Sequence, residues 1–493
     1  MYKDSDRYFR SISDVRELAQ KTLRGGVATV AGQGVNFILK LGSTMMLARL
    51  LVPGDFGLYG MVLIVLNFVQ MFKDFGLSQA LIQRPRITRE EASNLFWVNV
   101  GLSIVIAFAV AACGPLLAKF YGRSELALMT VVMAGGMLIS GFGLQHRALL
   151  IRNAHFGLLA IVETLAMVAS IVVALTMAWL GFAHWALVSQ ALVVGLVGVL
   201  GLWSVCRWVP GLWDRGISIR PYLKYGGNLA GFNLLNFFSR NADNMMIGYV
   251  CGAGPLGLYT KAYDLLMLPL VQINGPMTKV MLPALSRLLG NDEAYRRFYL
   301  KAVGLNISFT FPIVGAFLVA TKPLVLLFLG DAWLGAVPIF LALVPAAFVS
   351  ALNVTTGWVF QSRGTTDRQL KWTLFAAPLH VLAMFIGLQW GAVGVAWGVS
   401  LSFVVVRVPY WCYTFKGTPI AVRDVAQLVL AALCVVVPAA LFAKEIVSTL
   451  SLGILSGAVA LLALYGLLLI VIDWGLFRRA GLCFRLLDIR KYI

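Results

Sequence analysis

The chain has 493 residues, of which 60% are apolar and only 12% are charged. Soluble domains carry about twice that fraction of charged residues, so the composition excludes a soluble domain and predicts a polytopic membrane protein. The net charge of +19 would suggest a nucleic-acid partner in a soluble chain, but in a membrane protein it first reflects the excess of Lys and Arg in cytoplasmic loops, and no nucleic acid is expected. The six scattered cysteines form no CxxC pair or Cys/His cluster, so neither a disulfide framework nor a metal site is expected. No cofactor is expected either.

The first segment, residues 1–24, mixes basic and acidic residues without an apolar stretch, so we expect no signal peptide there. Its apolar residues recur at helical spacing, which predicts an amphipathic helix on the cytoplasmic face of the membrane, with a solvated tail as the alternative.

Long apolar runs then predict an all-α fold of about fourteen transmembrane helices, among them spans at 157–179 and 391–406. They form two pseudo-symmetric six-helix lobes followed by two C-terminal helices. The predicted parts are the first lobe at 25–206, a cytoplasmic linker at 207–224, the second lobe at 225–411, the last two spans at 412–475 and a basic cytoplasmic tail at 476–493. When alternate connections are assigned to opposite sides, most Lys and Arg residues lie on the side that holds both termini, which predicts cytoplasmic termini.

A polar stripe occurs twice in the chain, at an offset of 200 residues. Its two copies are Gln33, Asn36, Lys40, Ser43 and Thr44, and Asn233, Asn236, Arg240, Asp243 and Asn244. At about 100° per residue, each copy lies on one face of one helix. Lys40 and Arg240 lie within predicted membrane spans, where a charged side chain costs several kcal/mol unless it faces water, protein or ligand. The stripes therefore predict a polar cavity between two lobes, with hydrogen bonds inside the bundle as the alternative.

The repeat extends into the turn that follows each stripe, where Gly57 recurs as Gly257. The external loops are short and bring together no His, Asp and Glu for acid–base chemistry. No GxxxxGK[ST] phosphate loop occurs, so no ATPase is built in. Two prolines within spans, in the dipeptides Gly275-Pro276 and Phe311-Pro312, predict helix kinks.

Four segments resemble the Wzx/WzxC-like polysaccharide flippases of the MOP exporter superfamily, and most closely their exopolysaccharide branch. The segments are Ala48–Tyr59 (ARLLVPGDFGLY), Asp74–Arg84 (DFGLSQALIQR), Gly257–Tyr263 (GLYTKAY) and Pro283–Arg287 (PALSR). The resemblance implies a MATE-like fold and a flippase, not an enzyme. Its implied cargo is undecaprenyl-diphosphate-linked exopolysaccharide or lipopolysaccharide repeat units, which cross the bacterial inner membrane by alternating access. Membrane lipids, a polysaccharide polymerase and a chain-length regulator are the implied partners.

Such a cargo requires cations for the diphosphate and hydrogen-bonding groups for the sugars. The candidate cavity residues are the cations Lys40, Arg240, Lys261 and Lys279 and the amides Gln33, Asn36, Asn233 and Asn236. Lys261 and Asp264 are spaced i,i+3 and are able to neutralise each other. Lys279 has no acid near it in the sequence and is the better diphosphate candidate.

Uphill transport without an ATP site calls for an ion gradient or the membrane potential, and intramembrane acids are the usual coupling sites. The candidate acids are Asp243, Asp264, Glu163 and Asp74. A plain salt bridge between Asp243 and Arg240 is the alternative for the first of them.

Three other functions remain open from the sequence. A MATE-like drug or metabolite antiporter shares the fold, but it favours an apolar cavity with a key acid, whereas four mid-span cations favour an anionic cargo. A membrane glycan polymerase is disfavoured by the short external loops. A scaffolding subunit without transport activity is the third.

Overall fold

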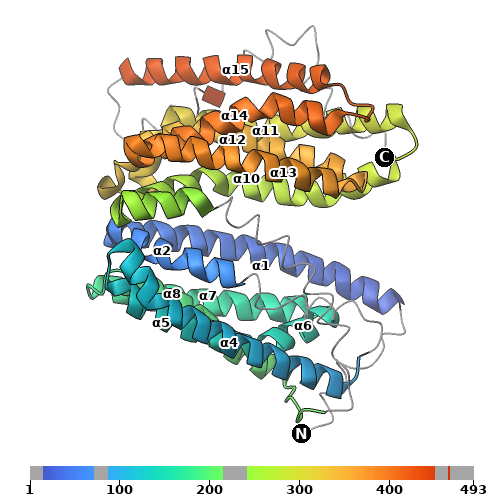
Figure 1. Cartoon of the computed structure of the whole chain (residues 1–493). Coiled ribbons are helices and arrows are strands. Elements are labelled where there is room, and N and C mark those ends of the chain that lie inside the picture. The colour runs from blue at the N-terminus through green and yellow to red at the C-terminus, as the bar shows by residue number, and fades with distance from the viewer. Residues whose placement is uncertain are drawn as a thin grey trace. The chain divides into compact units, whose positions relative to one another are not determined.

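The computed structural model describes residues 15–70, 81, 87–214, 241–449, 463 and 465–466, with side chains from residue 31 onward. Every element in these ranges is helical (Figure 1). Nine segments within them are long and apolar enough to cross a membrane. The chain is therefore an all-α, multi-pass membrane protein. The total of fourteen spans stays a prediction, because most of the last predicted span lies outside the described residues.

The chain divides into two compact units, one ending at Gly257 and one beginning at Leu258. The helices of the first unit are α1 (Val15–Leu50), α2 (Pro53–Gln70), α4 (Arg89–Tyr121), α5 (Glu125–Gly141), α6 (Leu144–Arg152), α7 (Phe156–Trp179), α8 (Trp185–Cys206) and a helical stretch at 241–250. Within this unit α4 packs along α5, and α7 packs between α1 and α8 (Figure 1). Since α1 begins at Val15, it includes the end of the segment expected to be amphipathic, whereas residues 1–14 lie outside the described part.

Local hydrogen bonds explain where α4 begins and ends. The backbone N–H of Glu91 donates to the Thr88 hydroxyl at 3.2 Å, and the backbone N–H of Thr88 donates to the Glu91 carboxylate at 2.9 Å. This reciprocal capping box satisfies two N–H groups that the first turn of a helix leaves without partners. At the other end Gly122 adopts φ 66°, a left-handed conformation that glycine takes without a Cβ penalty.

The first part of the predicted linker, residues 207–214, is fastened to α4. The Asn94 side chain donates to the Asp214 carbonyl at 2.7 Å and accepts from its N–H at 2.9 Å. The indole of Trp97 donates to the Gly211 carbonyl at 2.8 Å. Trp208 is fully buried, and its carbonyl lies 3.0 Å from the His146 ring nitrogen. The start of the linker is thus an ordered extension of the first unit.

The second unit contains most of α10 (Ala253–Arg287), followed by α11 (Asp292–Phe328), α12 (Ala336–Ser362), α13 (Thr366–Gly387), α14 (Gly391–Phe415) and α15 (Val422–Thr449), with short 3-10 turns at Asp331–Trp333 and Leu388–Trp390. α12 packs between α11 and α14, and α15 lies along α11 (Figure 1). The core of this unit combines aliphatic side chains with several large aromatic ones, including Tyr299, Phe311, Trp358 and Trp411.

α13 and α14 approach each other through glycines. A Cβ at Gly394 would overlap the carbonyl oxygen of Gly387, and a Cβ at Gly398 would overlap that of Ala383. Small residues allow helices in a membrane to come this close and so gain van der Waals contact.

The bend in α11 lies away from the predicted position. The helix keeps helical dihedrals at Pro312, and its non-helical residue is Ala320 (φ −99°, ψ 18°). Ala320 precedes Pro323 by three residues. Pro323 lacks an N–H, and its ring crowds the preceding turn, which accounts for a bend at this point.

The repeated glycines make a reciprocal contact between the first turns of α2 and α10. A Cβ at Gly57 would overlap the Ala253 carbonyl, and a Cβ at Gly257 would overlap the Pro53 carbonyl. All four residues belong to the first unit, which ends at Gly257. The contact gives a physical reason for glycine at both positions of the repeat.

Candidate substrate-binding faces

The polar stripe on α1 divides into an accessible part and an internal part. Gln33 and Lys40 are exposed, and Asn36 is half-buried. Ser43 is buried and accepts a hydrogen bond from the Gln190 amide on α8 at 2.9 Å. Lys40 and the amides of the stripe are therefore accessible from outside the helix bundle, whereas Ser43 contributes to the packing of α1 against α8.

Lys40 has no acidic partner among the residues that the structure describes, because none of the ion pairs formed there includes it. Its ammonium is thus available for an anionic ligand.

The second copy of the stripe is described only in part. Asn233, Asn236 and Arg240 lie outside the described residues, so their predicted role is not tested. Asp243 is buried, and its carboxylate accepts a hydrogen bond from the backbone N–H of Asn244 at 2.8 Å. The acid in this copy points into the protein.

A second accessible polar face lies on α10. The side chains of Gln272 and Lys279 are exposed, and Lys279 takes part in none of the ion pairs formed by described residues. Lys261 instead pairs with Asp264 at 3.6 Å, which confirms the mutual neutralisation that their spacing predicts. Lys279 therefore remains a cation of α10 that is open to a ligand.

Prolines add backbone acceptors to the same helix. Pro269, Pro276 and Pro283 lie inside α10, each seven residues after the one before. A proline has no N–H, so the carbonyl four residues earlier loses its helical partner. The carbonyls affected are those of Leu265, Gln272 and Lys279. Because seven residues are close to two turns, these acceptors recur on one face, beside the exposed side chains of Gln272 and Lys279.

The remaining candidate acids differ in their surroundings. Glu163 on α7 pairs with Arg147 on α6 at 2.7 Å, and Asp264 pairs with Lys261. Asp74 lies outside the described residues. Within the described ranges no group of three His, Cys, Asp or Glu side chains is placed to hold a metal ion.

One buried cation escaped the sequence analysis. Arg407 lies inside α14 with only 7% of its surface exposed. Its Nη2 donates to the Asn353 side chain and to the Val349 carbonyl, while Nε and Nη1 have no hydrogen-bond partner among the described residues. The sequence placed the end of this span at residue 406, so Arg407 counted as a loop residue. The helix continues to Phe415, and the only sequence signal was the aromatic run after Arg407.

The all-α fold, with its long apolar helices, defines a polytopic membrane protein. The fold resembles the solved structure of the lipid II flippase MurJ in an inward closed conformation, with a TM-score of 0.71 at 13% identity over 92% of this chain and 99% of that chain. It also resembles a multidrug resistance MATE family transporter of the MOP superfamily, with a TM-score of 0.62 at 18% identity over 80% of this chain and 95% of that chain.

The chain belongs to the polysaccharide biosynthesis protein family, whose model matches residues 46–338. It is 26% identical over 397 residues to the lipopolysaccharide biosynthesis protein WzxC of Escherichia coli (strain K12), which covers 79% of each chain. It is 27% identical over 344 residues to the teichuronic acid biosynthesis protein TuaB of Bacillus subtilis (strain 168), which covers 69% of this chain and 71% of that one. These findings confirm the resemblance drawn from the four sequence segments.

Proposed function

We propose that this protein is a flippase that moves undecaprenyl-diphosphate-linked repeat units of a bacterial exopolysaccharide or lipopolysaccharide across the cytoplasmic membrane by alternating access. Membership in the polysaccharide biosynthesis protein family supports a carbohydrate cargo. One relative is named a succinoglycan biosynthesis transport protein, ExoT of Rhizobium meliloti (strain 1021), which supports transport. The observation that carries the proposal is Lys40, an exposed cation with no acidic partner in the described part of the chain, on the helix α1 that the sequence predicts to cross the membrane.

The accessible faces of α1 and α10 fit the chemistry of such a cargo. Lys40 and Lys279 attract the diphosphate as point charges, and ionic hydrogen bonds of this kind are the strong ones. Gln33, Asn36 and the carbonyls freed on α10 bind sugar hydroxyls, which act as both donors and acceptors. The apolar polyprenyl tail stays in the bilayer, so the protein has to shelter only the headgroup.

The protein acts without chemistry of its own and draws energy from an ion gradient or the membrane potential. The candidate coupling acids are Asp243, which is buried, and Glu163, Asp264 and Asp74. Both termini lie in the cytoplasm, and a polysaccharide polymerase and a chain-length regulator act on the same lipid.

Deletion of the gene, followed by mass spectrometry of the membrane lipids, tests the function directly. The flippase proposal expects undecaprenyl-diphosphate oligosaccharide to accumulate and surface polymer to disappear. An unchanged lipid pool with normal polymer would contradict it and favour a small-molecule antiporter of the same fold.

Complementation of the deletion strain tests the proposed role of Lys40. We expect Lys40→Ala to lower polymer export at least about tenfold, because a lost ionic hydrogen bond costs about 1.5–3 kcal/mol. Lys40→Arg should restore part of the export. Lys119→Ala, which removes an exposed cation from the last turn of α4, is the matched control and should leave export unchanged. Normal export by Lys40→Ala at equal membrane abundance would remove Lys40 from the binding face.

A further inference from the structure

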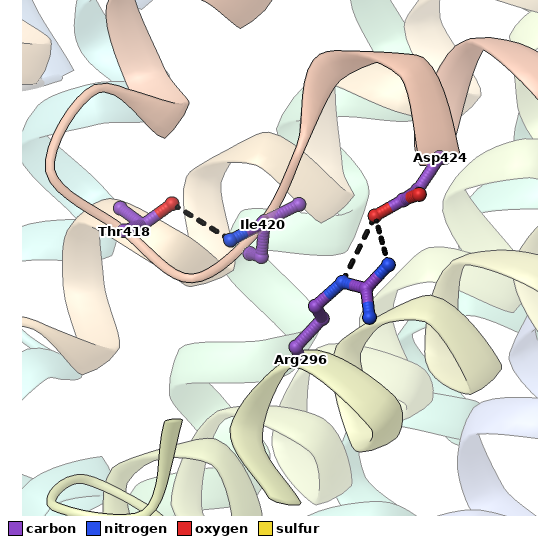
Figure 2. Close-up of polar contacts among 4 residues, drawn as sticks. All are labelled: Arg296, Thr418, Ile420 and Asp424. Carbon is purple, nitrogen blue, oxygen red and sulfur yellow. Dashed lines mark hydrogen bonds and ion pairs between the residues drawn. The ribbon is translucent and has the colours of Figure 1, made fainter. Parts of the chain in front are cut away.

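A cavity of about 590 Å³ lies between the first turns of α11 and α15 in the second unit. Its lining residues are Glu293, Arg296, Arg297, Leu300, Lys301, Asp424, Gln427, Leu428 and Ala431. Figure 2 shows Arg296 extending from α11 to Asp424 on α15. We refer to this cavity as the α11–α15 groove. It belongs to neither of the candidate substrate-binding faces.

The chemistry of the groove changes along its two helices. Glu293, Arg296, Arg297 and Asp424 lie toward the helix N-termini, and Leu300, Leu428 and Ala431 lie about one turn further along. Leu300 and Leu428 are partly buried and pack against the apolar core of the unit. A ligand that fits this lining has a polar head and an apolar chain.

The electrostatics of the groove favour a negative head. Three cations, Arg296, Arg297 and Lys301, line it against two acids, Glu293 and Asp424. The groove also lies at the N-terminal ends of two helices, since α11 begins at Asp292 and α15 at Val422. Each helix N-terminus carries about half a positive charge, which adds to the attraction for an anion.

The two arginines are used differently. Arg296 donates through Nε at 2.9 Å and Nη2 at 2.7 Å to one oxygen of Asp424, and this pair ties α15 to α11. Arg297 pairs with Glu293 one turn away on its own helix, and the Glu293 side chain is 79% exposed. An exposed i,i+4 ion pair contributes little to stability, because water screens both charges. A phosphate is therefore able to displace Glu293 from Arg297 without loosening the contact between the helices.

We propose that the α11–α15 groove binds an anionic phospholipid of the cytoplasmic leaflet. The phosphate lies at Arg297, with Lys301 adding positive charge, and an acyl chain lies along Leu300, Leu428 and Ala431. The distribution of Lys and Arg predicts that these ends of α11 and α15 are cytoplasmic, where basic pockets between membrane helices meet anionic headgroups. The bound lipid bridges α15 to the rest of the unit.

Native mass spectrometry of the detergent-solubilised full chain tests this assignment, with phosphatidylglycerol and phosphatidylcholine as the probes. We expect the protein to bind one phosphatidylglycerol molecule with a clearly higher affinity than phosphatidylcholine. Arg297→Gln should weaken phosphatidylglycerol binding about fivefold, the effect of one interfacial cation, and should leave phosphatidylcholine unaffected. Lys322→Gln removes an exposed cation further along the same helix and should bind phosphatidylglycerol like the wild type.

A second variant separates lipid binding from the contact between the helices. Exchanging the charges of the ion pair, Arg296→Asp with Asp424→Arg, keeps the net charge of the groove and the link between α11 and α15, so phosphatidylglycerol binding should persist. Equal binding of both lipids by the wild type would overturn the proposal. An equal loss of phosphatidylglycerol binding in Arg297→Gln and Lys322→Gln would also overturn it. So would complete displacement of phosphatidylglycerol by water-soluble glycerol phosphate, which lacks acyl chains.

Discussion

At the scale of single residues, the cations of this protein occupy two opposite environments. Lys40 and Lys279 are exposed on helices of a membrane protein, whereas Arg407 is buried within a unit and pairs with no carboxylate in the described part of the chain. Burying an ion costs several kcal/mol, which partners must offset. Arg407 recovers part of this cost from Asn353 and from the ring of Tyr410, whose centroid lies 5.5 Å from its guanidinium carbon.

Two substitutions of Arg407 separate its charge from its volume. Arg407→Met keeps most of the buried chain and removes the charge, so we expect the thermal stability of the purified protein to change little or to rise. Arg407→Ala leaves a cavity and should destabilise the protein by about 2–3 kcal/mol, because the long arginine side chain also packs. The midpoint of thermal unfolding in detergent measures both. If Arg407→Met were the less stable variant, the charge itself would have a partner beyond those described.

A buried amide pair ties α10 to α11 in the second unit. The Asn306 side chain donates to Asn274 at 2.8 Å, and both residues are buried. Asn274→Ala should lower the stability by about 1–2 kcal/mol, because it leaves a buried donor without an acceptor. The double variant with Asn306→Ala should cost less than the sum of the two single changes. A thermal-unfolding cycle of the four proteins measures this difference, and strict additivity would show that the bond contributes nothing.

The sequence predicted residue contacts best where they follow from helical spacing. Lys261 and Asp264 pair as expected, because three residues place them on the same side of one helix. The partners of Glu163 and Ser43, which are Arg147 and Gln190, come from other helices. Which helices become neighbours depends on the tertiary arrangement, and no local pattern in one sequence encodes it.

At the scale of elements, α13 and α14 depend on the absence of side chains at their contact. We expect Gly398→Ala to destabilise the protein by about 1–3 kcal/mol, because its Cβ would meet the backbone of Ala383, which is unable to yield as a flexible side chain would. Gly135→Ala in α5 is the matched control, since nothing lies within 4 Å of a Cβ there. Alanine should then favour the helix by about 0.5–1 kcal/mol. A lower unfolding midpoint for Gly398→Ala and a higher one for Gly135→Ala would support the close contact of α13 and α14. An unchanged midpoint for Gly398→Ala would contradict it.

The elements themselves were largely predictable, but their ends and bends were not. Long apolar runs identify spans such as α7, Phe156–Trp179, within a residue or two of the range expected for it. The end of α14 was placed nine residues too early, because Arg407 lowers the local hydropathy although it is buried in the fold. The bend at Ala320 was missed because the effect of a proline depends on how the neighbouring helices hold the chain.

At the scale of the whole molecule, the distribution of Lys and Arg predicts that both termini lie in the cytoplasm. Green fluorescent protein fused after the C-terminus should therefore fluoresce, since it folds on the cytoplasmic side. Alkaline phosphatase fused after Gly181, in the short turn between α7 and α8, should be active, because that turn is predicted to face the periplasm. A fluorescent fusion at Gly181 would reverse the predicted orientation.

The duplication was visible at this scale from one sequence, because the offset of 200 residues is constant through the stripe and the turn after it. The sequence alone did not explain why Gly57 and Gly257 are both glycine. The fold explains it, since each would place a Cβ against the backbone that begins the other helix, at Ala253 and Pro53.

This reciprocal contact makes the two copies of the duplicated unit evolve under a shared constraint. A larger residue at Gly57 pushes the first turns of α2 and α10 apart. A larger residue at Gly257 then has more room, so the second substitution destabilises the protein less than the first. The first substitution is therefore expected to be costly, and the second to cost less in its presence than alone, which is positive epistasis. Related chains should keep both glycines or lose both, so that a signature of the ancestral duplication persists where the two copies otherwise diverge.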